Sequence, residues 1–271
     1  MRKWILAALI VVGGGCDAVE EALAPAADEE ASAAVASTEL TRLEASLLVA
    51  VAEVTPLGEM PEAMAAAVGD ALAMVFSPAD CVEAQVVGAT VTATLDGCTG
   101  PRAVGASGVM NVAFAAEAAE SVALTLTATG LEVEGATMTI NATGALATDA
   151  DERRRVTVTT QGGGTAADGT LIGRTGGYTT TWDDDCLSID GQWTSSLGTT
   201  VFQTVVSDFR RCGAACPAAG TILYGQTDAE GAVGGSIEGE AITVRFDGSD
   251  VAGYVSTEAR AGRVALDCEA R

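Results

Sequence analysis

The feature that most constrains the fold is a change in hydrophobic period near residue 81. Before it, apolar residues recur every three or four positions, which is the period of an amphipathic helix, at Leu40, Leu43, Leu47, Val51, Val54, Met64, Val68, Leu72, Val75 and Phe76. After it, apolar and polar residues alternate in short runs separated by Gly, Asp and Asn, with no helical segment between them. The sequence therefore predicts a mainly β fold: an antiparallel meander, a sandwich or an open half-barrel, preceded by two α-helices.

The ends of the two helices can be placed from capping and stop signals. Ser37 or Thr38 is suited to cap the first helix, and Thr55-Pro56 ends it. Pro61 suits the first position of the second helix, which Ser77-Pro78 stops. We therefore expect residues 38–80 to form a helical pair that packs on a β domain of residues 81–271. Within that domain, residues 212–271 form a possible submodule framed by cysteines.

Composition restricts both the core and the partners of this 271-residue chain. Apolar residues make up 48% but aromatic residues only 4%, so the core must consist largely of aliphatic side chains. The 14 basic residues include Arg2 and Lys3, which leaves 12 arginines in the rest of the chain against 37 acidic residues. Nucleic-acid binding depends on clustered Lys and Arg, so no nucleic-acid partner is expected.

Cysteine is present in an odd number, seven, so one cysteine cannot pair within the chain. Six of them lie in the predicted β domain, at Cys81, Cys98, Cys186, Cys212, Cys216 and Cys268. An even set in an exported chain is typical of disulfides, and the lack of His and of Cys-x-x-Cys pairs disfavours zinc. Six cysteines allow about 15 pairings. We predict Cys81–Cys98, Cys186–Cys212 and Cys216–Cys268.

The seventh cysteine, Cys16, follows a short N-terminal segment of the kind that directs protein export. Arg2 and Lys3 are followed by an apolar run from Trp4 to Val12, too short to span a bilayer as a helix, and then by three glycines. This arrangement resembles a bacterial lipoprotein signal, in which small residues precede an invariant cysteine. The resemblance implies that residues 1–15 are removed and that Cys16 carries acyl chains. The alternative is ordinary secretory cleavage near Ala24-Pro25-Ala26.

The lipoprotein resemblance also implies a location. Acyl chains on Cys16 would hold the protein on a membrane of the bacterial cell envelope, because two or three buried chains anchor firmly. The outer membrane or the cell surface is favoured, and the periplasmic face of the inner membrane remains an alternative. Residues 16–37 are rich in Ala and acidic residues, so they are expected to form a flexible tether between the lipid and the fold.

Several catalytic mechanisms lack their residues in this chain. There is no His at all and no Lys after Lys3. Ser-His-Asp triads, Cys-His pairs, phosphate-binding lysines and Schiff-base lysines are therefore excluded after the leader. We expect no enzymatic activity and no cofactor. Carboxylate chemistry is the one type that the composition permits, so a carboxylate-dependent hydrolase such as a glycosidase stays open as a minor alternative.

The clearest acidic cluster lies between two predicted strands. It consists of Asp183, Asp184 and Asp185, with Asp190 a few residues further on. Such oxygens are weak candidates for a Ca²⁺ site, although the spacing matches no EF-hand loop. The alternative is a polar turn without a metal.

Aromatic residues gather near this cluster. Tyr178 and Trp182 lie four residues apart on a predicted strand, hence on one face, and Trp193 follows. An exposed set of this kind could stack on sugar rings, whereas a buried set would belong to the core.

Taken together, these patterns predict a lipid-anchored envelope protein with a non-enzymatic binding or structural role. Two alternatives stay open. A half-barrel with helices and an apolar cavity would suit an envelope carrier of lipids or lipoproteins, and an exposed aromatic face would suit a polysaccharide-binding module.

Overall fold

The computed structural model describes residues 17–101, 104–118, 121–149, 151–165, 169, 171–183, 185–197, 200–227, 237 and 239–268, with side-chain burial from residue 27 onward. It contains the helices α1 (Asp17–Val54) and α2 (Pro61–Val75) and a 3₁₀ turn η1 (Ala79–Cys81). The strands are β1 (Val82–Val87), β2 (Thr90–Thr99), β3 (Gly105–Ala118), β4 (Ser121–Val133), β5 (Ala136–Thr148), β6 (Arg154–Thr165), β7 (Leu171–Trp182), β8 (Cys186–Leu197), β9 (Thr200–Cys212), β10 (Ala219–Gln226), β11 (Ala241–Arg245), β12 (Val251–Ser256) and β13 (Ala261–Ala265).

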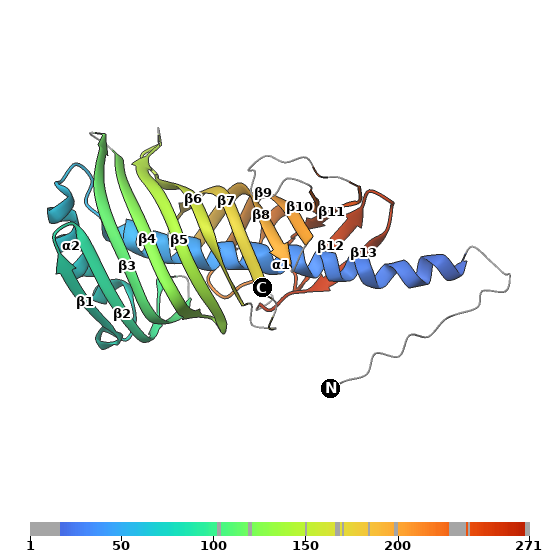
Figure 1. Cartoon of the computed structure of the whole chain (residues 1–271), viewed down its shortest axis with the longest axis horizontal. Helices are drawn as coiled ribbons and strands as arrows, with labels where there is room; N and C mark the ends of the chain where they lie inside the picture. The colour runs from blue at the N-terminus through green and yellow to red at the C-terminus, as the bar shows by residue number, and fades with distance from the viewer. Residues whose placement is uncertain are drawn as a thin grey trace.

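All thirteen strands belong to one open antiparallel sheet in which each strand pairs with the next along the chain. The sheet arches around α1, which runs across the strands inside the arch (Figure 1). The predicted fold class, a mainly β antiparallel meander with two preceding helices, is confirmed. Because β10 pairs with β9, residues 212–271 continue the same sheet.

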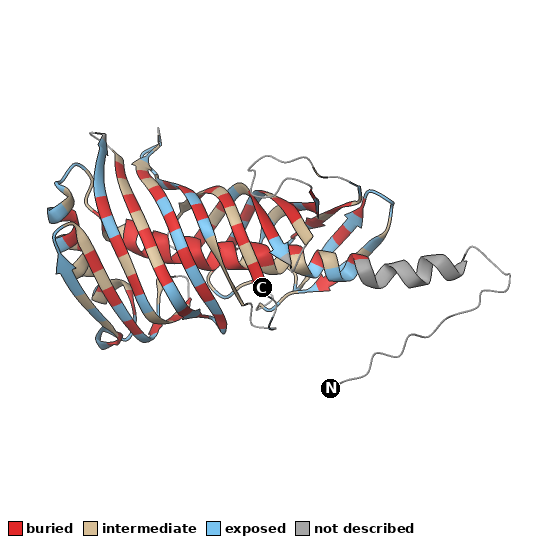
Figure 2. Cartoon of the chain, in the orientation of Figure 1, coloured by how far each residue is buried: buried red, intermediate tan, exposed pale blue. Residues whose placement is uncertain are grey.

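The period of two along each strand separates the two faces of the sheet. In β5, Met138 and Ile140 are buried, whereas the alternating residues Thr137 and Thr139 are exposed, as the sequence predicts. The same alternation runs through most of the sheet (Figure 2). The concave face and α1 therefore share one continuous hydrophobic core.

α1 begins far earlier than predicted. The sequence predicts a flexible tether up to residue 37, but the helix is continuous from Asp17, so that prediction is wrong. The reason is an alanine stripe: Ala27, Ala31 and Ala34 recur at helical spacing and are fully buried in the core. Alanine has the highest helix propensity, and this part of α1 contacts β10, β11 and β13. Alanine differs little in hydrophobicity from its neighbours, so its helical period does not stand out in the sequence.

The far end of α1 is held by the sheet. Its last turn contains no basic residue of its own. Arg154 at the start of β6 supplies one, and its Nη1 donates to the backbone oxygens of Ala52 and Glu53 at 2.5 and 3.1 Å. These are carbonyls that the helix end leaves without intrahelical partners, and a cation there also suits the helix dipole.

α2 covers the beginning of the sheet. It packs against β1, β2 and β3 with Met64, Ala65, Val68 and Leu72 buried. It starts at Pro61 and ends before Ser77-Pro78, as predicted. In the described part of the chain, neither helix has the length and apolar character needed to cross a membrane.

Three disulfides join the six cysteines in the predicted pairs. Cys81–Cys98 fixes η1 to the end of β2. Cys186–Cys212 links cross-strand neighbours of β8 and β9. Cys216–Cys268 ties the segment after β13 to the β9–β10 connection. This third disulfide holds the end of β13 near α1.

Candidate functional site

Buried polar side chains join the middle of α1 to β6, β7 and β8. We call this set the polar seam, and it comprises Ser37, Thr41, Glu44, Thr160, Arg174, Tyr178, Trp193 and Ser195. All eight are buried, although six of them are polar or charged residue types that the sequence pattern would place on a surface. The seam therefore replaces hydrophobic packing by hydrogen bonds along the middle of the concave face of the sheet, which we call the trough.

Glu44 is the centre of the polar seam. Its Oε1 accepts from the Tyr178 hydroxyl and its Oε2 from the Thr160 hydroxyl, both at 2.9 Å. Its Oε2 also pairs with the Arg174 guanidinium, whose Nη1 donates to the Thr41 hydroxyl at 2.8 Å. A buried carboxylate is tolerated only when it is paired and hydrogen-bonded in this way.

Two further effects mark the seam as structural. Burial, followed by the negative charge of Glu44, raises the pKa of Tyr178 well above its usual value, so this hydroxyl stays protonated and donates. Trp193 donates through Nε1 to the Ser37 hydroxyl at 2.8 Å, and Ser37 also bonds Ser195. Apart from Nε of Arg174, which has no hydrogen-bond partner among the described residues, these side chains satisfy one another, which leaves little capacity for a ligand.

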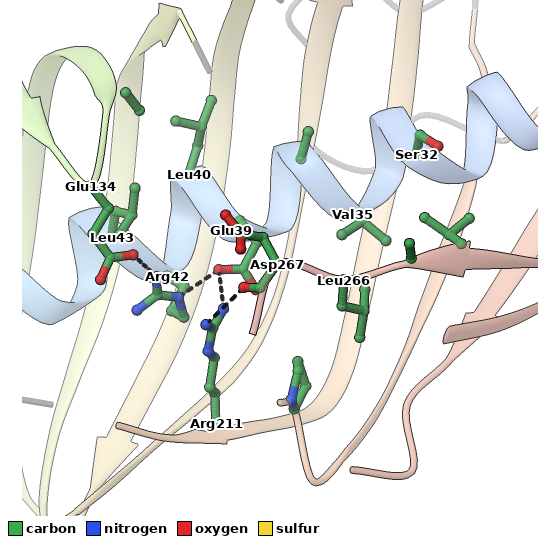
Figure 3. Close-up of a pocket in the computed structure, with 15 residues that line it drawn as sticks. Ser32, Val35, Glu39, Leu40, Arg42, Leu43, Glu134, Arg211, Leu266 and Asp267 are labelled. Atoms are coloured by element: carbon green, nitrogen blue, oxygen red, sulfur yellow. Dashed lines mark hydrogen bonds and ion pairs between the residues drawn. The ribbon is translucent and has the colours of Figure 1, made fainter. Parts of the chain in front are cut away.

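Beside the seam, another face of α1 lines a groove of about 450 Å³. The residues around it are Ser32, Val35, Ala36, Glu39, Leu40, Arg42, Leu43, Glu134, Ala136, Arg211, Pro217, Val264, Ala265, Leu266 and Asp267. Their positions on α1 follow helical spacing, and the other walls come from the β4–β5 turn, the end of β9 and the end of β13 (Figure 3). We refer to this site as the groove.

The β4–β5 turn reaches the groove because it is a tight hairpin. Glu134 and Gly135 both have positive φ, 48° and 79°, which is typical of the two-residue turns that match strand twist. Glycine adopts positive φ freely. Glu134 adopts it in this turn, and its carboxylate reaches α1. Its Oε2 accepts from Arg42 Nη2 at 2.5 Å.

An ion-pair network forms the floor of the groove. Oε2 of Glu39 accepts from Arg42 Nε at 2.6 Å and from Arg211 Nη1 at 2.7 Å. Arg211 Nη2 also donates to the backbone oxygen of Asp267 at 3.4 Å. Two guanidinium groups thus lie below the surface, each held by carboxylates (Figure 3).

The network fixes the protonation state of Glu39. Burial raises its pKa, but the charges of Arg42 and Arg211 and their hydrogen bonds outweigh burial, so the pKa is lowered overall. A general acid needs the opposite shift, because it must hold a proton near neutral pH. The network therefore disfavours Glu39 as a general acid.

Of the two alternatives that the sequence left open for these aromatic residues, the structure places Tyr178 and Trp193 in the core rather than on an exposed face. Tyr178 and Trp193 are 3% and 0% exposed, because both belong to the polar seam beneath α1. Trp182 lies on the same concave side of β7 and packs half-buried against the core. Tyr178 and Trp193 are therefore large pieces of an aromatic-poor interior.

The acidic residues near β7 and β8 serve the turns between strands. Asp183 accepts from the Cys186 amide at 2.8 Å and pairs with Arg210 at 2.6 Å. Asp190 accepts from the Asp208 amide at 2.7 Å, and Asp185 is exposed. Within the described residues, no three His, Cys, Asp or Glu side chains converge on a metal position. Asp184 and Cys16 lie outside the described residues.

The sequence alone does not predict the groove. Glu39 and Arg42 lie three apart on the predicted helix, which is a recognisable ion-pair spacing. Their partners Glu134 and Arg211 are 92 and 172 residues away from them, respectively, so only the fold unites the four. Comparisons of the chain with models of protein families, with curated proteins and with solved structures gave no match.

Proposed function

We propose that this chain is a lipid-anchored protein of the bacterial cell envelope with a non-enzymatic binding role. The observation that carries the anchor is cysteine pairing. Six of the seven cysteines form three disulfides, so Cys16 has no cysteine left with which to pair inside the chain. Its place after Gly13-Gly14-Gly15 supports acylation, and disulfides suit an oxidising envelope compartment.

α1 would then act as a spacer. The helix starts at Asp17, the residue after Cys16, and its N-terminal part extends past β13 (Figure 1). The groove begins at Ser32, fifteen residues further along α1, which corresponds to about 22 Å at 1.5 Å per residue. Attachment at Cys16 would hold the groove near the membrane without burying it, on the outer membrane or at the cell surface, with the periplasmic face of the inner membrane as the alternative.

The groove supports the binding role. Its volume lies in the range of small-ligand pockets, about 300–1,000 Å³, and its walls are mainly apolar with a few charged groups. The trough itself gives no support to a lipid carrier, because α1 fills the concave face with residues of the core. The pKa of Glu39 likewise gives no support to a carboxylate hydrolase.

Mass spectrometry of the mature N-terminus tests the anchor. Protein from the membrane fraction is expected to begin at Cys16 and to carry the mass of a diacylglyceryl group, with or without a further acyl chain. The Cys16→Ser variant should incorporate no labelled fatty acid. Cys268→Ser, which removes a disulfide cysteine instead, should retain the label. An unmodified chain starting near Ala27 would overturn the anchor.

A further inference from the structure

The carboxylates around the groove are more exposed than its two guanidinium groups. The side chains of Glu39 and Glu134 are 27% and 34% exposed, whereas those of Arg42 and Arg211 are 4% and 10% exposed. Asp267 at the rim is exposed as well. A molecule that enters therefore meets negative charge first, although two arginines lie beneath it.

These carboxylates also keep acceptor capacity. Each of Glu39 and Glu134 uses Oε2 for its arginine partners. Among the described residues, no group donates to the Oε1 atom of either side chain, or to the carboxylate of Asp267. Three carboxylates thus retain free oxygen atoms around one small space (Figure 3).

The remaining lining of the groove is mainly apolar. Val35, Leu40 and Leu43 come from α1, and Val264 and Leu266 come from the segment that the Cys216–Cys268 disulfide ties back. A protein partner usually covers about 800 Å² of each surface, whereas a pocket of about 450 Å³ is suited to a small molecule. Three carboxylates and two guanidinium groups leave one net negative charge beside this apolar lining, which complements a molecule that has an apolar tail and a positive head.

We infer that the groove binds small cationic amphipaths: molecules with an alkyl tail and one ammonium or guanidinium group. The tail lies along Leu40, Leu43 and Leu266, and the head donates to the free oxygens of Glu39, Glu134 and Asp267. This inference deepens the proposed binding role and rests on it. It does not depend on lipid attachment at Cys16, so the two can fail separately.

The test uses the full chain carrying Cys16→Ser, so that no acyl chain of its own competes for the groove. Decylammonium, decanoate and butylammonium are titrated below their micellar concentrations and followed by calorimetry. Decylammonium should bind saturably with one site. Decanoate should bind at least ten-fold more weakly because of its charge, and butylammonium because it lacks the tail.

The double variant Glu134→Gln/Asp267→Asn removes two of the three groove carboxylates, including the one that pairs with Arg42, and leaves the Glu39 pairs with Arg42 and Arg211 intact. It should weaken decylammonium about ten-fold or more, since a hydrogen bond to a charged group contributes at least a factor of this size. Glu132→Gln, an exposed carboxylate on the same hairpin, is the matched control and should leave affinity unchanged. Circular dichroism and the melting temperature identify any variant that fails to fold.

Three outcomes would overturn the inference. Decanoate binding as tightly as decylammonium would assign the groove to anionic or neutral amphipaths and leave a binding role in place. Equal affinity of the double variant would place the ligand elsewhere. No saturable binding of any probe would remove the groove as a ligand site, while the N-terminal mass would still decide the anchor independently.

Discussion

The two halves of the trough hold the helices by different means. Along β2–β5 the concave face is apolar, and α2 and the C-terminal part of α1 present apolar residues to it. Along β6–β8 the polar seam replaces this packing by hydrogen bonds centred on Glu44. Apolar contact is non-directional and buries a helix without fixing its rotation. Directional bonds fix rotation and axial position, so the seam sets which face of α1 lines the groove.

The largest expected effect comes from breaking the polar seam. Glu44→Ala leaves the Arg174 guanidinium buried without its carboxylate, which should lower the free energy of unfolding by about 3–5 kcal/mol. Urea denaturation measures the loss. Glu29→Ala, an exposed glutamate on the same helix, should change stability by less than about 0.5 kcal/mol.

A double replacement sharpens this result. Glu44→Leu with Arg174→Met removes both charges and fills similar volume, so much of the stability should return. If the seam positions α1, the double variant should still bind decylammonium less well, because the groove face is no longer held in register. A loss below about 1 kcal/mol for Glu44→Ala would show that the seam is not a fixed network.

In the apolar half, the effect of a substitution on stability should depend on side-chain volume rather than on a specific functional group. Leu48 is fully buried on α1, and Leu48→Ala should cost about 2–5 kcal/mol through lost burial and a cavity. Leu48→Met keeps the volume and should cost less than about 1.5 kcal/mol. Met74→Ala, 81% exposed on α2, serves as the neutral control in the same denaturation series. Equal losses for Leu48→Ala and Leu48→Met would contradict a packing-driven region.

The apolar half is also the part that the sequence predicts best. Alternation identifies inward residues such as Met138 and Ile140, and leucine spacing identifies part of the buried surface of α1, which is buried on all sides over residues 40–52. Thr160 and Arg174 escape this reasoning because polar residues on a strand are assigned to the solvent side. Their burial depends on Glu44, more than one hundred residues away in sequence.

The groove is hidden from sequence for the same physical reason. Glu39 and Arg42 form a local pair, but the groove needs Glu134, Arg211 and the returning end of β13. The disulfide pairing was predictable because cysteines are few and their loops are short or terminal. The alanine stripe of α1 was not, since Ala27 and Ala31 carry too little hydrophobic contrast to reveal a helical face.

A smaller effect should appear in the free energy of unfolding at acidic pH. The pKa of Glu39 is lower in the folded chain than the usual glutamate value of about 4.3. Its ion pairs therefore contribute stability that is complete above that value and is lost as the pH falls through the folded pKa. Denaturation between pH 7 and pH 3 should show the wild type and Glu39→Gln converging as the pH falls. A constant difference across that range would contradict the pKa shift.

The smallest effect concerns the end of α1 in the apolar half, where Arg154 makes a directional contact. Arg154→Ala removes two donors to the carbonyls of Ala52 and Glu53, and should cost about 1 kcal/mol because water can partly replace them. Hydrogen exchange should show faster opening of the last turn of α1, with the amides of the polar seam unchanged. Arg153→Ala is the control, since the partners of Arg153 among the described residues are Asp149 and Asp151 in the exposed turn. If exchange accelerated along the whole helix instead, the two halves of the trough would form one cooperative unit, and the seam alone would not set the position of α1.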